Sequence, residues 1–561
     1  MKFIASILKT TAIRGLLTTA LVGVLSVGAV RADTLRVMQG TALKTVDPIV
    51  TTSGDTQIHG YLIYDKLFEF DSHGTARPQL ADKVDLNSDK KTYTITLRKG
   101  LKFSDGTPIT TDDVIPSVKR WESRDVVGGL LGARTKEMVK VDDLTFRIQL
   151  NEPFDVPSAL ASIVGNIPFI MPKRVASLPS TVQLTDTTGS GPYQFDYSNW
   201  NPGQTAVYTK NPFYISRNDT PSFYWGKKEA TFDKIEISAV PDANTAMAAM
   251  LTDKEDIWLT PSLDNALALR KDPKLVVSNG YFVQSFIMLN HAVPPFNNPK
   301  ASLALTYLID QKEIMQITVG DPQFWHTCYA YLTCEGTYGD ESAYSGHRGA
   351  MDYEKAKELF KEAGYDGKPI VILDETDWPS AHATALYLGQ QLRKIGVQVD
   401  LQSMDWATLS TRRTSKAPAS EGGWSLYSNY VEVGNGGNPL THLAMAANCD
   451  KAWFGWPCDE KIEQLRAAFA NSVDESEKKK ITFELQARAS AYVPFVMTGE
   501  YGIPSVYGAD LEGFNPETSF SYFLEYPPKD PVGGSLLLLR RQVWSGMLST
   551  GCFPSFPWRE W

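Results

Sequence analysis

The chain has 561 residues, of which 43% are hydrophobic and 21% charged, and its formal net charge at pH 7 is −9. This composition is typical of a soluble protein with a large core and excludes a disordered or fibrous chain. The length predicts three or four domains of roughly 150 residues. The acidic isoelectric point near 5.5 argues against a nucleic-acid binder, which needs a basic surface.

The first 32 residues predict a cleavable secretory signal. Lys2, Lys9 and Arg14 precede an uncharged apolar stretch over residues 15–30, and Ala32 ends the segment. That stretch is shorter than the ~20 residues that span a bilayer. Its removal takes away four of the 55 basic residues, so 51 remain against 64 acidic ones and the net charge becomes −13. No Cys follows to carry a lipid anchor, so we expect a protein free in the periplasm.

Five cysteines in an oxidising compartment indicate disulfides. Cys328 lies close to Cys334 in the sequence, and Cys449 lies close to Cys458, so each pair predicts one bond, while Cys552 is left over. Buried free thiols are the alternative, because spacing alone does not fix disulfide geometry. Metal binding is a weaker alternative. The seven histidines are scattered, and neither Cys pair has the spacing of a zinc site, so we expect no metal ligand and no cofactor.

The first half of the mature chain predicts short strands and an α+β segment. A strand starts at Leu35, and two longer strands follow from the alternation of apolar and polar residues over 91–100 and 144–150. Between them, Ser104 to Pro108 form a turn and Thr111 opens a helix.

The second half predicts alternating helices and strands. A helix begins after Asp352 and ends at Gly364, and a strand follows over 369–373. A second helix runs through Leu386, Leu388, Leu392 and Ile395 to Gly396, before a strand in which Val397, Val399 and Leu401 alternate. This βαβ order predicts a parallel sheet covered by helices, hence an α/β lobe.

Sequence patterns of enzyme sites are absent from the chain. Gly189-Ser190-Gly191 does not match the G-x-S-x-G nucleophile turn, and the sequence has no phosphate-binding, H-E-x-x-H or dinucleotide-binding motif. Carboxylate pairs such as Asp112 with Asp113 are common at solvated helix starts. We therefore predict no catalytic residues and no enzyme activity.

Several ordered segments resemble one family. They are Thr45 to Pro48, Tyr64 to Leu67, Ala81 to Lys83, Lys91 to Pro108, Asp112 to Val114, Gly189 to Tyr193, Lys210 to Tyr214, Pro241-Asp242, Asp256-Ile257 and Pro294 to Phe296. In this order they are similar to the peptide/opine/nickel-binding solute-binding proteins of ABC transporters, family 5, which include dipeptide- and oligopeptide-binding proteins. Ser190 stands where that family usually has Thr. The resemblance covers about residues 33–525.

The resemblance implies an α/β, two-lobed periplasmic-binding-protein fold of class II and the large type, with an extra α+β domain inserted in the N-terminal lobe. The solute is enclosed between the lobes, and two crossing strands form the hinge. The expected division is a signal at 1–32, a lobe I core of 33–80, 186–284 and 500–525, the inserted domain at 81–185, lobe II at 285–499, and a C-terminal extension of uncertain structure at 526–561.

The resemblance also implies where a peptide's α-ammonium binds. Peptide-binding members often place an Asp four residues before a Pro in lobe II, and here Asn435 occupies that position before Pro439. An amide cannot supply the negative charge that a buried ammonium needs, so ordinary binding of free-amine peptides is in doubt. Glu432 is the acid that could substitute, and an exposed loop acid is the alternative interpretation.

Further candidate contacts come from both lobes. Trp424, Tyr427 and Tyr430 could form walls of the cleft, with core packing as the alternative for each. Thr51, Thr52 and Ser53 lie where first-lobe contacts usually lie, and Asn290 is expected near the hinge.

The predicted function is that of a periplasmic receptor that delivers a small peptide or an amino-acid-derived solute to an ABC permease. A monomer without nucleic-acid partners is expected. The alternatives are a receptor for an opine, oligosaccharide or chelated nickel, and a hydrolase or chaperone-like factor on the same fold.

Overall fold

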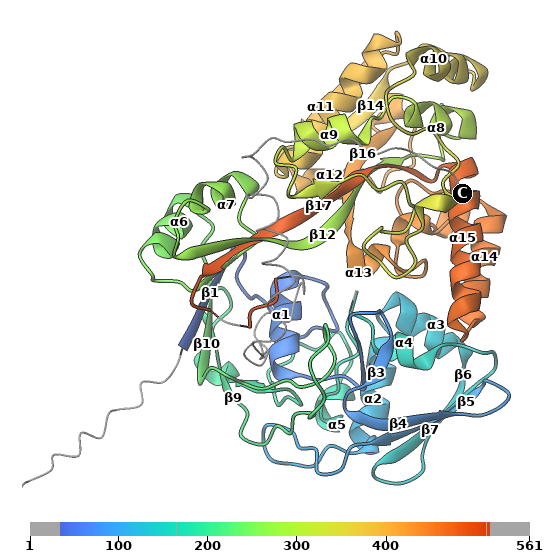
Figure 1. The fold of residues 1–561 in the computed structure, drawn as a ribbon. Helices are drawn as coiled ribbons and strands as arrows, with labels where there is room; N and C mark the ends of the chain where they lie inside the picture. Colours follow the sequence, from blue (N-terminus) through green and yellow to red (C-terminus); the bar gives the residue numbers. More distant parts are fainter. Residues whose placement is uncertain (1–33, 164, 512, 517–561) are drawn as a thin grey trace, which may run out of the picture.

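The computed structural model describes residues 34–163, 165–511 and 513–516. The predicted signal and the predicted extension at 526–561, including Cys552, lie outside these residues. Figure 1 shows two lobes, the lower built from the first half of the chain (blue to green) and the upper from the second half (yellow to orange). Within the described segments, no helix is both long and apolar enough to cross a bilayer.

One mixed sheet runs through both lobes. Its strand order is β15-β14-β16-β12-β17-β11-β1-β10-β9-β8, and the short β13 pairs with β17 off this path. The bounds are β15 Val399–Met404, β14 Ile370–Glu375, β16 Leu426–Glu432, β12 Leu275–Leu289, β17 Phe495–Gly508, β11 Ile257–Leu259, β1 Thr34–Gln39, β10 Lys234–Ala239, β9 Ala206–Lys210, β8 Tyr193–Phe195 and β13 Trp325–His326.

The antiparallel strands β12 and β17 are the long elements that connect the lobes (Figure 1). The C-terminal part of β12 pairs with β16 of the upper lobe, while the C-terminal part of β17 pairs with β11 of the lower lobe. The predicted lobe boundaries fall inside these strands, on residues that face each other: Gln284 pairs with Glu500, and Ser285 with Gly499. The division into lobes at these positions stays a prediction.

The inserted domain is an antiparallel sheet of order β4-β5-β7-β6 with helices against it. Residues Tyr93, Ile95 and Leu97 of β5 are buried and alternate with half-buried threonines, as the sequence pattern predicts. Helix α2 begins with a capping box between Thr110 and Asp113. The bounds are β4 Ala81–Leu86, β5 Thr92–Leu97, α2 Thr111–Glu122, α3 Val126–Arg134, β6 Thr135–Lys140, β7 Thr145–Leu150, α4 Val156–Leu160 and α5 Lys173–Ala176.

The upper lobe contains the predicted βαβ unit. Strands β14 and β15 are parallel and are joined by α11. Gly364 and Gly396 follow α10 and α11 with φ values of 80° and 84°, a left-handed conformation that favours glycine and ends a helix. Two details differ from the prediction: β15 starts only at Val399, and Leu386 is exposed because it lies on the solvent side of α11.

Helices cover both faces of the upper-lobe sheet, with one apolar core on each side. The lower lobe and the inserted domain share one continuous core. The remaining elements are α1 Gly54–Ile63, β2 Phe68–Phe70, β3 Ala76–Pro78, α6 Ala243–Leu251, α7 Leu263–Leu269, α8 Pro299–Thr306, α9 Gln311–Thr318, α10 Tyr353–Glu362, α11 Pro379–Lys394, α12 Trp406–Arg412, α13 Val433–Gly436, α14 Glu460–Asn471 and α15 Glu475–Tyr492.

Both predicted disulfides are present. Cys328 is bonded to Cys334, and Cys449 is bonded to Cys458. Each bond closes a short loop of the upper lobe, so the thiols of these four residues are not available as metal ligands.

Candidate ligand-binding cleft

A cavity of about 300 Å³ lies between the lobes. The lower lobe contributes the loop before α1, the start of α1, Ile163 and Gly165, and the upper lobe contributes the end of β16, α13 and the loops that follow. The lining residues are Thr52, Gln57, Ile163, Gly165, Phe286, Asn429, Tyr430, Val431, Glu432, Asn435, Thr441, His442, Leu443, Ala444 and Trp453.

The lower-lobe wall is organised by Gln57, a buried residue of α1. Its side-chain amide donates to the Thr51 carbonyl oxygen at 2.9 Å, which fixes the loop that carries Thr52 into the wall. The Gln57 Oε1 atom is buried and has no hydrogen-bond partner among the described residues. Of the three predicted hydroxyl residues, Thr52 lines the cavity. The Thr51 hydroxyl instead accepts a hydrogen bond from the Ser53 backbone, and the Ser53 hydroxyl bonds to Asp55.

The upper-lobe wall begins where β16 leaves the core. Tyr430 is 38% exposed, and its ring stacks on Trp378 with the centroids 5.2 Å apart. Glu432 ends the strand beside it. Burial raises the pKa of Glu432 to about 7, and no cation in the described part of the chain forms an ion pair with its carboxylate. An acid in this environment is poised to gain a positively charged partner.

Asn435 lies in α13 on the same wall. Its backbone oxygen accepts a hydrogen bond from the Thr441 hydroxyl at 2.7 Å, which ties α13 to the loop that follows. The structure therefore brings four predicted residues together around one cavity: Thr52, Tyr430, Glu432 and Asn435.

Three other predicted contacts lie in the upper-lobe core and do not line this cavity. Trp424 and Tyr427 are fully buried and pack edge to face at 5.1 Å. Asn290 is also fully buried, and its amide donates to the Trp424 carbonyl oxygen at 2.9 Å. The physical reason is the path of β16, whose first residues cross the core and whose last four reach the cleft. For Trp424 and Tyr427 the core-packing alternative describes the structure, and Asn290 is buried beside them.

Eleven of the fifteen lining residues were not predicted, and His442 and Trp453 are two of them. His442 is fully buried, stacks on Phe495, and has its pKa lowered to about 3 by burial, so it is neutral at physiological pH. Trp453 lies inside the loop closed by the Cys449–Cys458 disulfide. An aromatic residue within a predicted disulfide loop is the sequence signal that could have identified Trp453. His442 gave no comparable signal.

A smaller cavity of about 60 Å³ adjoins the first one and shares Ile163 and Thr441 with it. Its lining is mostly apolar and comes from the inserted domain and from α14 and its surroundings. At its rim Lys478 of α15 forms an ion pair with Asp155, the residue that caps α4. The two lobes are thus in direct contact on this side of the cleft.

Two lobes that enclose a solute-sized cavity and are joined by two long strands define a two-lobed solute-binding protein. Residues 75–448 match the family described as bacterial extracellular solute-binding proteins, family 5 Middle. A probable peptide ABC transporter periplasmic-binding protein, y4tO of Sinorhizobium fredii, is 35% identical over 87% of this chain and 93% of its own. The glutathione-binding protein GsiB of Pectobacterium atrosepticum is 26% identical over 86% of this chain and 92% of its own.

A solved structure supports the same fold. The periplasmic binding protein DppA of Helicobacter pylori, in complex with the peptide STSA, superposes with a TM-score of 0.69 at 20% identity, covering 88% of this chain and 98% of that one. The chain therefore belongs to family 5 of the bacterial extracellular solute-binding proteins. The predicted resemblance and the predicted two-lobed fold are confirmed.

Proposed function

We propose that this protein is the periplasmic receptor of a peptide ABC importer and that it binds a short peptide, or an amino-acid-derived solute with a free amine, in the cavity between its lobes. The family supports this function, as do the names of two relatives, the probable peptide ABC transporter periplasmic-binding protein y4tO and the glutathione-binding protein GsiB. The observation that carries it is Glu432, a half-buried acid on the cavity wall whose carboxylate forms no ion pair within the described part of the chain.

Glu432 supplies the charge that Asn435 cannot. A ligand ammonium beside the carboxylate would compensate for the hydration that the carboxylate loses on burial. Solvent would be excluded from this ion pair when the lobes close. The unpartnered Gln57 Oε1 on the opposite wall offers an acceptor for a further N–H group. Both features favour a ligand rich in donors, as a peptide is.

The volume of the cavity limits the size of the ligand. A volume of about 300 Å³ lies at the lower end of the ~300–1,000 Å³ range of small-molecule sites. This size favours a di- or tripeptide over a long oligopeptide. The aromatic faces of Tyr430 and Trp453 would contact side chains without selecting one sequence.

Transport follows from a change of shape. We propose that β12 and β17 act as the hinge near Gln284 and Glu500, and that the permease distinguishes the closed, loaded form from the open one. In this proposal the receptor works as a monomer in the periplasm, where its disulfides are stable.

The test is calorimetric titration of the mature chain with an unmodified dipeptide and with its N-acetylated form, after mass spectrometry of any solute that co-purifies. We expect Glu432→Gln to weaken binding of the unmodified dipeptide about 10- to 150-fold. This factor corresponds to the loss of a charge-assisted hydrogen bond of about 1.5–3 kcal/mol. Asn435→Asp should strengthen it. The matched control is Glu375→Gln, since burial also raises the pKa of Glu375 to about 7 but this acid does not line the cavity.

Equal binding of the two dipeptide forms by the wild-type protein would contradict the ammonium site. An equal loss in Glu375→Gln and Glu432→Gln would also contradict it.

A further inference from the structure

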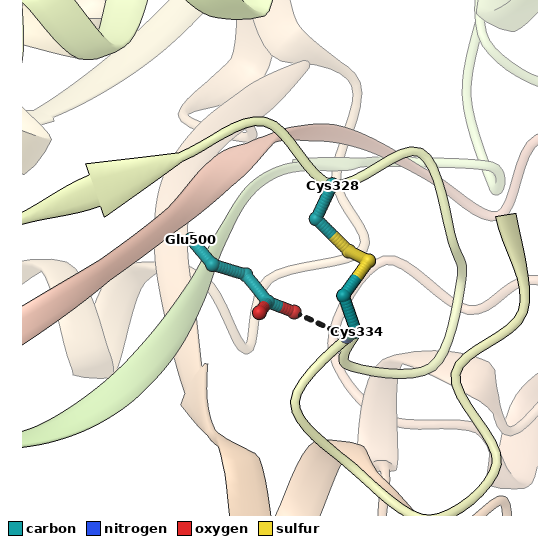
Figure 2. A group of neighbouring side chains, drawn as sticks. All are labelled: Cys328, Cys334 and Glu500. Carbon is teal, nitrogen blue, oxygen red and sulfur yellow. Dashed lines mark hydrogen bonds between the residues drawn. A yellow bond between two sulfur atoms is a disulfide. The ribbon is translucent and has the colours of Figure 1, made fainter. Parts of the chain in front are cut away.

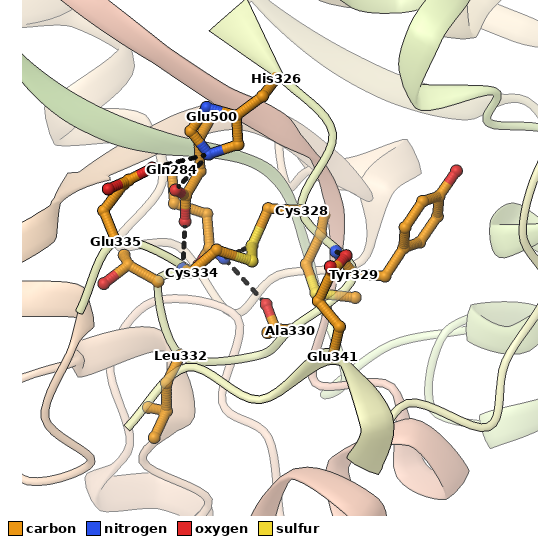
Figure 3. The surroundings of a disulfide bond; sticks show 12 residues. Gln284, His326, Cys328, Tyr329, Ala330, Leu332, Cys334, Glu335, Glu341 and Glu500 are labelled. Carbon is orange, nitrogen blue, oxygen red and sulfur yellow. Dashed lines mark hydrogen bonds and ion pairs between the residues drawn. A yellow bond between two sulfur atoms is a disulfide. The ribbon is translucent and has the colours of Figure 1, made fainter. Parts of the chain in front are cut away.

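Three potential metal ligands meet beside the proposed hinge, outside the cleft wall. They come from β13, from the residue that directly follows the Cys328–Cys334 disulfide loop, and from β17. His326 Nε2 lies 3.0 Å from Glu500 Oε2 and 3.6 Å from Glu335 Oε1, and one ligand atom from each residue lies within 4.8 Å of the other two. Figure 3 shows the imidazole and both carboxylates converging beside the disulfide.

We propose that His326, Glu335 and Glu500 bind a divalent first-row transition-metal ion, with Zn²⁺ as the representative cation. In a tetrahedral zinc site with bonds of about 2.0–2.2 Å, neighbouring ligand atoms lie roughly 3.4 Å apart. The two distances from His326 Nε2 bracket this value, so small side-chain adjustments would complete the site. Water would take the fourth position, because His326 and Glu335 reach solvent.

The charges of the three groups support a cation. Two carboxylates face the same imidazole nitrogen, and a single proton on that nitrogen can bond to only one of them at a time. A divalent ion accepts a lone pair from all three groups, and its charge balances the two carboxylates. Glu500 is fully buried, and a buried carboxylate is costly unless it is compensated.

The surroundings fix the orientation of the ligands. The Cys334 backbone N–H donates to Glu500 Oε1 at 2.6 Å, which leaves Oε2 directed at His326, as Figure 2 shows for the Cys334 contact. Strand pairing places His326 opposite Glu500. Glu335 directly follows Cys334, so the disulfide also limits where this third ligand can lie. Imidazole and carboxylate together suit zinc and its neighbours better than calcium or magnesium.

The test uses the full mature chain, dialysed against EDTA and titrated with Zn²⁺ in a calorimeter. We expect one equivalent to bind with a micromolar or lower Kd, and His326→Gln and Glu335→Gln each to weaken binding at least tenfold. Glu335 is exposed, so its substitution keeps the fold. The matched control is His382→Gln, which removes another histidine paired with a buried carboxylate, Asp374, at 2.7 Å.

The X-ray absorption spectrum of the zinc complex should show nitrogen and oxygen neighbours only. Three results would overturn the proposal: no stoichiometric binding to the wild-type protein, an equal loss in His382→Gln and His326→Gln, or sulfur in the metal shell. Sulfur would mean that thiols of an opened disulfide bind the ion instead.

Discussion

The titration of Glu432 gives the sharpest physical test of the cleft. Burial raises the pKa of this carboxyl to about 7 from a reference value of 4.5. Between these two values the folded protein holds a proton that the unfolded chain has already lost. The free energy of unfolding therefore falls as pH rises from 4.5 to 7, and the full cost of the buried charge is present above pH 7.

The magnitude follows from the difference between the two pKa values. One pKa unit corresponds to about 1.4 kcal/mol, so the burial of ionised Glu432 costs about 3 kcal/mol in the protein without ligand. We expect Glu432→Gln to be more stable than the wild-type protein by an amount that grows from about zero at pH 4 to about 3 kcal/mol at pH 8. Glu375→Gln should change stability in the same direction but by a smaller amount, because burial also raises the pKa of Glu375 to about 7 while solvent screens this half-buried acid.

The pH dependence of ligand binding should distinguish Glu432 from Glu375. A proton competes with the ligand ammonium for Glu432, so the wild-type affinity for an unmodified dipeptide should fall up to about tenfold per pH unit below pH 7. The affinity of Glu432→Gln should not change with pH in this range, whereas Glu375→Gln should follow the wild-type protein.

Two measurements check this reasoning. Urea unfolding at pH 4, 6 and 8 gives the stability differences, with Glu354→Gln as an exposed control. Calorimetry with the dipeptide at the same pH values gives the affinities. A stability difference between Glu432→Gln and the wild-type protein that stays constant from pH 4 to pH 8 would refute the burial of this charge.

Two further predictions concern contacts around the cleft. Asp155→Asn leaves Lys478 without its ion-pair partner when the lobes are in contact. It should weaken ligand binding at least fivefold and shift the small-angle scattering of the liganded protein toward the open form. Unchanged scattering and affinity would show that this ion pair does not stabilise the closed form. Replacing Cys449 and Cys458 by Ser should lower the affinity for the ligand as much as Trp453→Ala does. Wild-type affinity in the double variant would show that the disulfide does not position the Trp453 ring.

Local patterns explain what the sequence predicted well. The alternation in β5 and β7 and the β14-α11-β15 unit depend on neighbouring residues, so periodicity and caps were sufficient. The connecting strand β12 has no such signal. It passes from one lobe to the other, and its side chains meet a different environment along its length.

The cleft was predictable in part from the family resemblance. That resemblance implies the positions of Glu432 and Asn435 before Pro439, and both residues line the cavity. Their contacts with a ligand remain predictions. Trp424 and Tyr427 share that motif region but lie in the core, because sequence spacing does not reveal the residue at which β16 leaves the core.

The proposed metal ligands could not be predicted from spacing at all. His326 lies in the two-residue strand β13, and Glu335 lies in the irregular segment that follows. Glu500 is distant in sequence and is brought to them by the pairing of β13 with β17. The spacing of the histidines gave no signal, because the partner of His326 is Glu500 on another strand and not a second histidine.

The two disulfides restrain residues of both proposed sites, so both sites should depend on an oxidising compartment. Their sequence separations are 6 and 9 residues, so each constrains the unfolded chain less than a ~100-residue loop would, for which the entropic stabilisation is about 4.7 kcal/mol. Each closed loop instead carries or adjoins one side chain that a site needs: Trp453 lies inside one loop, and Glu335 directly follows the other. The constraint on local shape acts in the folded state, where the geometry of the site is set. Reduction should therefore impair the two sites before it unfolds the lobe.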